Sequence, residues 1–377
     1  MILNDNSSMW FVLVLFVGVL ILGVVENTVL LRRMEHIPIR ILVNGTRGKS
    51  SVTRMLVTAL NGCGIRTFGK STGSVARFIL PDLSEEDVPR KRVKRIVHEH
   101  DMMFRKALEH ECQAIVCECM AIREENQKIM GDKLVRPTVT IITNARVDHV
   151  DQMGSTEEET ADVLIRSIGP SKDIFTADKV VAEALKGRDG NVHLVESLQQ
   201  EYEPYLQKFG FPVYAENLSI VLEVCRTLGL PDEDVLESVV RTVPDFGMRG
   251  NVDVDGHVIV NGFASNDAES AKRLLGNLDM NEVTVIYNNR SDREFRLKMF
   301  ADLFREAGVT DLVTIGDNVN KCRRYFSKAL GNDAVKEGFG HPDADIGMSR
   351  HTVVCMGNIK GAGQALLDYC AGRLTEA

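Results

Sequence analysis

The sequence predicts an α/β protein in which a P-loop central domain is preceded by one N-terminal transmembrane helix and followed by a smaller Rossmann-like α/β domain. Three observations support this prediction. An uncharged apolar stretch lies near the start of the chain, a glycine-rich loop follows a short β-branched run, and a second alternation of strands and helices fills the last third. The length of 377 residues suits two or three domains.

The apolar stretch covers residues 9–25 and contains no charge. A bilayer is spanned by about 20 apolar residues. Asp5 is the only charge before the stretch, whereas Arg32 and Arg33 close it, and basic residues prefer the cytoplasmic side. We therefore expect residues 1–33 to form an uncleaved, single-pass anchor in the cell membrane, with the N-terminus outside and the remaining domains on the cytoplasmic side. A buried core helix is the alternative interpretation.

A phosphate-binding loop follows the anchor. Residues 40–43 form a short, largely apolar run typical of a buried strand, and apolar residues recur at helical spacing after the loop. In such a unit, glycines let backbone N–H groups approach an anion, and the helix N-terminus adds positive potential. Lys49 then reaches the outer phosphates, and Ser50 is placed to bind Mg²⁺. The predicted nucleotide contacts are Gly45, Thr46, Arg47, Gly48, Lys49, Ser50 and Ser51.

Two further predicted strands end in polar groups. One run, over residues 112–117, leads to Glu118, and a β-branched run over residues 138–143 leads to Asp148 and His149. The carboxyl ends of parallel strands form the crevice in which α/β proteins bind ligands, and carboxylate oxygen is a suitable ligand for Mg²⁺. We expect these groups to lie beside the phosphate loop. A surface position for Glu118 is the alternative.

The last third restarts the β/α pattern. Strands are expected at residues 258–260, 283–287, 312–316 and 353–357, and a helix is expected to begin at Glu294. We therefore expect a C-terminal domain over residues 251–377, after a central domain over residues 34–250.

Composition excludes some classes of protein. The net charge is −8, and no zinc-finger spacing or other nucleic-acid-binding module occurs, so we expect no nucleic-acid partner. The eight cysteines are scattered and contain no C-x-x-C pair, which favours reduced structural thiols over a disulfide framework.

The spacing of the motifs resembles a known superfamily. Only two residues separate Gly45 from Gly48, and His149 lies in an N-x-x-x-D-H-x-D-x-x-G pattern. Both features resemble the Mur ligase and folylpolyglutamate synthase superfamily. Within it, the apolar N-terminal segment, the G-K-S-T-G run from Gly69 and the E-C-M-A run from Glu118 are similar to the ligase subunits of poly-γ-glutamate synthases, the PgsB/CapB family. Asp267 stands where the superfamily usually has proline.

This resemblance implies a Mur-ligase-like central domain and an ATP-dependent, ADP-forming amide ligase. It would activate a γ-carboxylate as an acyl phosphate and add glutamate to a growing poly-γ-glutamate chain for a capsule or secreted polymer. The implied cofactors are ATP and Mg²⁺, with two ions. The implied partners are glutamate, the polymer and other membrane subunits of the synthase. An ATP-binding switch or scaffold for polymer export, and a ligase for another amino-acid polymer, are the alternatives.

The resemblance also implies roles for individual residues. Ser50, Glu118 and His149 would bind the metal ions, and Lys49 would act with Glu118 and His149 in catalysis. Asn217 would contact the adenine, Arg249 the phosphates and Asp292 the ribose; a helix N-cap is the alternative for Asn217. The expected substrate contacts are Lys70, Ser71, Thr72, Arg77, Asn266 and Asp267.

Overall fold

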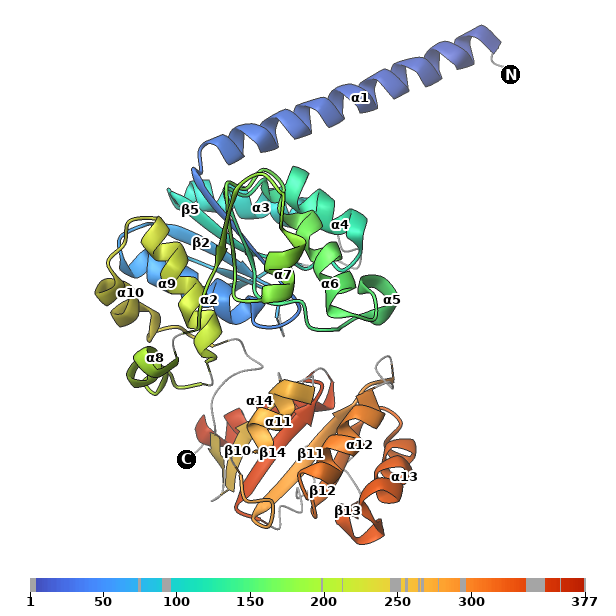
Figure 1. The fold of residues 1–377 in the computed structure, drawn as a ribbon. Coiled ribbons are helices and arrows are strands. Elements are labelled where there is room, and N and C mark those ends of the chain that lie inside the picture. Colours follow the sequence, from blue (N-terminus) through green and yellow to red (C-terminus); the bar gives the residue numbers. More distant parts are fainter. Residues whose placement is uncertain are drawn as a thin grey trace. The chain divides into compact units, whose positions relative to one another are not determined.

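The computed structural model divides the chain into two compact units, which are described separately (Figure 1). The first comprises Met1–Lys208 and Val213–Val243, and the second comprises Phe209–Pro212 and Pro244–Ala377. The structure describes residues 5–73, 76–89, 96–197, 199–211, 213–244, 252–254, 257–263, 265, 268–276, 278–291, 296–336, 350–359 and 361–375. Arg249, Asn266, Asp267 and Asp292 lie outside these described residues.

An eight-stranded sheet forms the centre of the first unit, with strand order β4-β3-β2-β5-β1-β6-β7-β8. β1 lies between β5 and β6 and is parallel to both, whereas β3 and β4 form an antiparallel edge. The central strands are apolar on both faces because helices cover both faces. The strands are β1 Ile39–Asn44, β2 Thr67–Ser71, β3 Arg77–Ile79, β4 Glu85–Asp87, β5 Ala114–Glu118, β6 Val139–Ile142, β7 Asp173–Thr176 and β8 Asn191–Leu194.

Helices pack on this sheet from both sides. Helix α2 contacts β2, β5, α9 and α10, whereas α3 contacts β2 and the end of α1. Phe104 of α3 packs with Phe68 and Ile115 in one apolar cluster. The helices of this unit are α1 Asp5–Glu35, α2 Lys49–Gly62, α3 Ile96–Glu109, α4 Glu124–Ile129, α5 Val150–Met153, α6 Glu157–Leu164, α7 Lys179–Ala184, α8 Gln199–Leu206, α9 Ala215–Thr227 and α10 Asp232–Val239.

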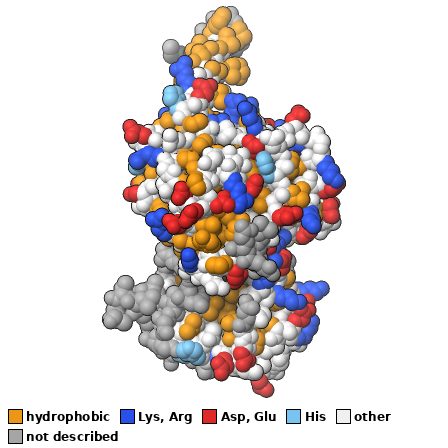
Figure 2. Space-filling model, turned by 60° about the vertical axis from the view of Figure 1, so that its left-hand side comes forward, with side chains coloured by type: hydrophobic (Ala, Val, Ile, Leu, Met, Phe, Trp, Pro, Cys, Tyr) orange, Lys and Arg blue, Asp and Glu red, His pale blue; other side chains and the backbone are white. Residues whose placement is uncertain are grey.

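Helix α1 has two parts with different surroundings. Its segment Met9–Glu35 is apolar and long enough to cross a membrane by length and composition, and Figure 2 shows its exposed part as a largely hydrophobic surface. The last turns are different, because Leu30 and Met34 are buried in the same cluster as Phe104 and Arg33 pairs with Asp101 of α3. The apolar helix therefore continues directly into the core of the first unit.

The second unit is built on a six-stranded sheet with the order β13-β12-β11-β14-β10-β9. Its strands are parallel except for β9, which runs antiparallel to β10. Tyr287 on β11 packs against Phe300 and Phe326 from two helices. The elements are β9 Val252–Val254, β10 His257–Asn261, α11 Ala268–Leu275, β11 Val283–Asn289, α12 Arg296–Glu306, β12 Leu312–Gly316, α13 Val319–Leu330, β13 Val335–Lys336, β14 Thr352–Gly357 and α14 Ala362–Thr375.

A buried ion pair lies between β2 and α3. Lys70 Nζ lies 3.2 Å from Glu99 Oε2, and both side chains are almost completely buried. Successive residues of a strand point to opposite faces, so Lys70 faces α3 whereas Ser71 faces α2. Residues 69–71, in the G-K-S-T-G run, are the end of β2. Lys70 is thus a buried partner of Glu99, and this position does not favour the expected contact with a substrate.

We predict that this pair tolerates joint removal better than the loss of one charge. Lys70→Met or Glu99→Gln should each destabilise the protein by about 3–5 kcal/mol, because the remaining group is buried without its partner. The double variant Lys70→Met/Glu99→Leu should lose less than either single variant. The measurement is the thermal unfolding midpoint of the detergent-solubilised chain.

The matched control for this prediction is Lys128→Met. Lys128 Nζ lies 2.6 Å from Asp132 Oδ2, but the Lys128 side chain is 68% exposed, so its loss should cost less than about 1 kcal/mol. Single variants at the buried pair that unfold like this control would contradict the interpretation.

Candidate nucleotide and metal site

The loop between β1 and α2 can form only with glycine at two positions. Gly45 has φ +125° and Gly48 has φ +85°, which are conformations that other residues rarely adopt. A Cβ added at Gly45 would lie 2.1 Å from Thr143 Oγ1, and one added at Gly48 would lie 2.8 Å from Asn217 Oδ1. The backbone therefore passes close to the segment after β6 on one side and to α9 on the other.

Hydrogen bonds fix this loop against the segment that follows β6. Thr46 N–H donates to the Asn144 backbone oxygen at 3.0 Å, and Thr46 Oγ1 donates to Asn144 Oδ1 at 2.8 Å. The Arg47 backbone oxygen accepts from Thr143 Oγ1 at 2.5 Å and from Asn144 Nδ2 at 3.1 Å. These contacts hold the loop in one conformation.

The buried side-chain amide of Asn44 supports the phosphate loop. Asn44, at the end of β1, is 1% exposed. Its Oδ1 accepts from Gly45 N–H at 2.8 Å, and its Nδ2 donates to Gln127 Oε1 at 2.7 Å and to Ser167 Oγ at 2.8 Å. Asn44 directly precedes the phosphate loop, but Gln127 and Ser167 lie far along the chain and the sequence did not reveal them.

The start of α2 is suited to bind an anion. Gly48 is its N-cap and supplies no side-chain hydrogen bond, and the first turn contains no acidic residue. Unsatisfied N–H groups and the helix dipole therefore give positive potential at this end. Lys49 Nζ donates to the Gly45 backbone oxygen at 2.7 Å, across the loop. Burial lowers the pKa of Lys49, and the nearby Glu118 carboxylate opposes this shift.

Glu118 joins three elements at the carboxyl ends of the central strands. Its carboxylate accepts from Ser50 Oγ at 3.0 Å, from Ser71 Oγ at 3.0 Å and from Thr72 N–H at 2.6 Å. Glu118 is 3% exposed, so it is not a surface residue. Within the described part of the chain, no basic side chain forms an ion pair with it.

This donor set fits a hard divalent cation. A carboxylate and two hydroxyls provide oxygen ligands of the kind that Mg²⁺ prefers, together with waters and substrate phosphate. Among the described residues, no three His, Cys, Asp or Glu side chains converge to form a metal centre. The carboxylate and hydroxyls are therefore suited to an ion whose remaining ligands are waters and substrate phosphate.

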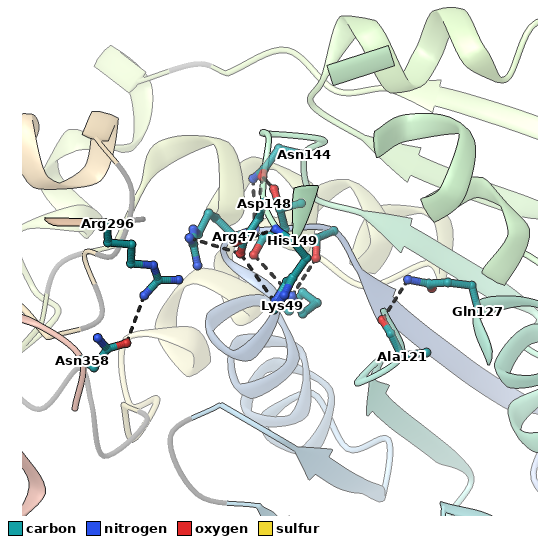
Figure 3. Close-up of polar contacts among 11 residues, drawn as sticks. Arg47, Lys49, Ala121, Gln127, Asn144, Asp148, His149, Arg296 and Asn358 are labelled. Carbon is teal, nitrogen blue, oxygen red and sulfur yellow. Dashed lines mark hydrogen bonds and ion pairs between the residues drawn. The ribbon is translucent and has the colours of Figure 1, made fainter. Parts of the chain in front are cut away.

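Asp148 and His149 lie in the loop before α5, beside the phosphate loop (Figure 3). Arg47 Nη2 lies 3.3 Å from Asp148 Oδ2. His149 adopts a left-handed conformation with φ +48°, and its N–H donates to Asp148 Oδ1 at 2.9 Å. A left-handed conformation is uncommon for residues other than glycine, although histidine adopts it more often than most. The structure thus brings Arg47, Lys49, Asp148 and His149 together.

Two further residues predicted from the sequence, Asn217 and Arg77, lie in the first unit. Asn217 is 6% exposed and lies against the turn at Gly48. The alternative of an N-cap is wrong, because the N-cap of α9 is Tyr214. Arg77 Nη1 lies 2.8 Å from Asp87 Oδ1, so it is already paired on the antiparallel edge.

A second polar group of residues lies in the other unit, at the carboxyl ends of β11 and β14. Arg296 Nη1 donates to Asn358 Oδ1 at 3.1 Å (Figure 3). Asn289 Nδ2 donates to the Asp317 backbone oxygen at 2.7 Å. The sequence did not identify Asn289, Arg296 or Asn358 as candidate site residues.

Comparison with known proteins identifies the family. One family profile, the Mur ligase middle domain, matches residues 43–188, and another, the poly-γ-glutamate synthase CapB C-terminal domain, matches residues 250–373. The capsule biosynthesis protein CapB of Bacillus anthracis is 30% identical over 377 residues, which are 93% of this chain and 80% of that protein. The chain belongs to the CapB family.

Further matches agree with membership of the CapB family. The PGA synthase CapB of Bacillus subtilis (strain 168) is 28% identical over 382 residues, covering 96% of this chain and 97% of that protein. A folylpolyglutamate synthase/dihydrofolate synthase from Yersinia pestis, solved with AMPPNP and a Mn ion, has a TM-score of 0.65 at 15% identity and covers 91% of this chain and 92% of that one. The expected superfamily fold and the resemblance to the PgsB/CapB ligase subunits are confirmed.

We predict that Gly45→Ala disrupts the phosphate loop. The added Cβ has no room beside Thr143, so the loop must move and nucleotide affinity should fall at least about tenfold, or ~1.4 kcal/mol. The measurement is equilibrium binding of a fluorescent ATP analogue to the solubilised chain.

Gly64→Ala is the matched control for this substitution. Gly64 has φ +84° with no atom within 4 Å of an added Cβ, so only the left-handed penalty of about 1–2 kcal/mol remains. Its nucleotide affinity should be unchanged. Equal binding by the two variants would show that the close approach to β6 is unimportant.

Proposed function

We propose that the chain is an ATP-dependent, ADP-forming amide ligase that adds glutamate to a growing poly-γ-glutamate chain at the membrane. Membership of the CapB family supports this proposal. The observation that carries it is the buried Glu118 carboxylate, held by Ser50 and Ser71 beside a preformed phosphate loop. This arrangement is suited to ATP and a divalent metal ion, and hence to phosphoryl transfer.

The proposed reaction has two steps. A γ-carboxylate oxygen of the acceptor attacks the γ-phosphorus of ATP, and the bond to ADP breaks. The amine of the incoming glutamate then attacks the acyl carbon, loses a proton and displaces phosphate. Phosphoryl transfer requires chiefly positioning and charge stabilisation, which the N-terminus of α2 and Lys49 supply to the phosphates.

Two Mg²⁺ ions are proposed, and each has a different set of protein contacts. The first would be held by Ser50 and Glu118, and the second by His149. Bound Mg²⁺ supplies positive charge that offsets the repulsion between phosphate and carboxylate. The Ser50 hydroxyl, which now donates to Glu118, would turn its lone pair toward the ion. Arg47 and Asp148 are placed to hold the phosphate loop and the His149 loop together.

Substrate and nucleotide contacts outside these residues are proposals from the family resemblance. Ser71 and Thr72 are supported by their position at Glu118, and Asn217 by its position at Gly48. Arg77 is a weaker candidate because Asp87 already pairs with it. Further proposed contacts are Arg249, Asp292, Asn266 and Asp267, which lie outside the described residues.

The proposed organisation is an anchor over residues 1–33, an ATP-binding domain over 34–250 and a C-terminal domain over 251–377. The division of the structure after Val243 and the family match beginning at residue 250 support the second boundary. The apolar part of α1 would cross the cell membrane with the N-terminus outside, beside other synthase subunits. Protease protection of the main domains in right-side-out vesicles tests this orientation.

We predict that ADP release requires both substrates. Solubilised protein with Mg²⁺ and ATP should release ADP rapidly only when glutamate and a short γ-glutamyl oligomer are present together. Lys49→Ala should reduce this rate at least about 100-fold, because a charge that stabilises the transferred phosphoryl group is lost. The measurement is a coupled ADP assay, with product length followed by mass spectrometry.

The control variant is Lys133→Ala, at an exposed position of the same unit, and it should leave the rate unchanged. His149→Ala should retain ATP binding but require more Mg²⁺ for turnover if it holds the second ion. ADP release that ignores both substrates, in detergent and in membranes containing the other synthase subunits, would favour an ATP-driven switch or scaffold instead.

A further inference from the structure

A basic groove runs along helix α13 of the second unit, and the proposed chemistry does not use it. Its volume is about 650 Å³. Its described lining consists of residues 318–320, in the turn that begins α13, and four side chains of the helix. These are Lys321, Arg324, Tyr325 and Lys328.

The helical repeat places these four side chains on one face. They follow the i, i+3, i+4, i+7 spacing of a single stripe, which at 1.5 Å per residue is about 10 Å long. All four are exposed. The opposite face carries Cys322 and Phe326, which are fully buried in the apolar core of the unit. Packing therefore fixes which side of α13 meets solvent.

The electrostatics of this stripe favour an anionic ligand. Helix α13 contains no acidic residue, and within the described part of the chain no carboxylate forms an ion pair with Arg324 or Lys328. Like charges three and four residues apart repel each other. Asp317 lies near the start of the groove, but its carboxylate is hydrogen-bonded to another segment. It accepts from Ser291 N–H and Oγ at 3.0 Å each.

The N-terminal end of α13 adds to this positive potential. Its N-cap, Asn318, has φ +53° and supplies no side-chain hydrogen bond to the helix. The first N–H groups of the helix therefore point toward the end of the groove without a cap. The groove combines three cations, a phenol hydroxyl and a helix dipole of the same sign.

We propose that this groove binds the γ-glutamyl chain itself, through the free α-carboxylates that every γ-linked residue carries. Successive carboxylates would pair with Lys321, Arg324 and Lys328, and Tyr325 would donate its hydroxyl to one of them. Arginine and lysine form charge-assisted hydrogen bonds with carboxylates. This inference rests on the proposed function, because it identifies the ligand as the polymer that the enzyme extends.

An anionic membrane surface is the competing ligand, and the structure favours the polymer. Helices that lie on membranes insert an apolar face among the lipids. The apolar face of α13 is already buried in its own unit through Cys322 and Phe326. The exposed stripe forms a groove lined by cations, which suits an extended polyanion.

Holding the polymer near the enzyme should lengthen the product without changing the chemistry. A tethered chain end has a high effective concentration for the next addition. Loss of the stripe should therefore release the polymer earlier and give shorter chains. A single addition needs no tether, so its rate with a short oligomer should be unaffected.

The test removes three charges from the groove in the full-length chain. The variant Lys321→Gln/Arg324→Gln/Lys328→Gln should bind fluorescently labelled poly-γ-glutamate at least about tenfold more weakly, as the loss of three ion pairs implies. High salt should weaken binding by the unmodified chain in the same direction. The products should be shorter, whereas the rate with a short γ-glutamyl oligomer should stay within about twofold.

A matched control removes three exposed charges from other helices of the same unit. It should leave polymer binding and product length unchanged. The control substitutions are Lys272→Gln, Arg273→Gln and Arg305→Gln.

Three results would overturn the proposal. They are a groove variant that binds the polymer as tightly as the control, an unmodified chain that does not bind the polymer, and a groove variant that loses binding to phosphatidylglycerol vesicles but not to the polymer. Polymer binding uses no ATP and is measured apart from turnover. An unmodified chain that binds the polymer through the groove but never extends it would contradict the proposed function alone.

Discussion

The Glu118 carboxylate is the group on which the arrangement of the nucleotide site depends. A buried carboxylate is costly unless donors or cations surround it, and here its donors come from the start of α2 and the end of β2. Ser50, Ser71 and Thr72 therefore converge because they satisfy one charge. The same requirement leaves oxygen atoms of a carboxylate and two hydroxyls together, which is the environment that a hard cation prefers.

A second constraint is the close approach of the phosphate loop to the segment after β6. Thr143 and Asn144 bind the loop backbone at Thr46 and Arg47, and Asn144 also accepts from the Thr46 hydroxyl. The Arg47 side chain is not used in these contacts and reaches Asp148 across the gap. The nucleotide loop and the His149 loop are thus connected through both backbone and side chain, and a change in one is expected to reach the other.

Local patterns in the sequence predicted the phosphate loop and half of the described strands, seven of fourteen, because alternation and glycine act over a few residues. The position of Lys70 was not predictable in this way. Whether it or Ser71 faces the site depends on the pleat of β2, and its partner Glu99 lies on a separate helix. Asn217 was ambiguous for a similar reason: only the packing of α9 on the loop distinguishes a contact at Gly48 from a helix cap. Asn44 and its partners required the complete fold.

The continuity of α1 with the core has a practical consequence for preparing a water-soluble form. Removing residues 1–33 would delete Leu30 and Leu31, which pack with the core, and Arg33, which pairs with Asp101. The truncated protein would expose apolar surface on α3 and tend to self-associate. Val25 and Val29 are both exposed. A cut between them would remove the exposed apolar part of α1 and keep the last turns, which pack against the core. The useful boundary for truncation therefore lies inside α1, before Arg32 and Arg33.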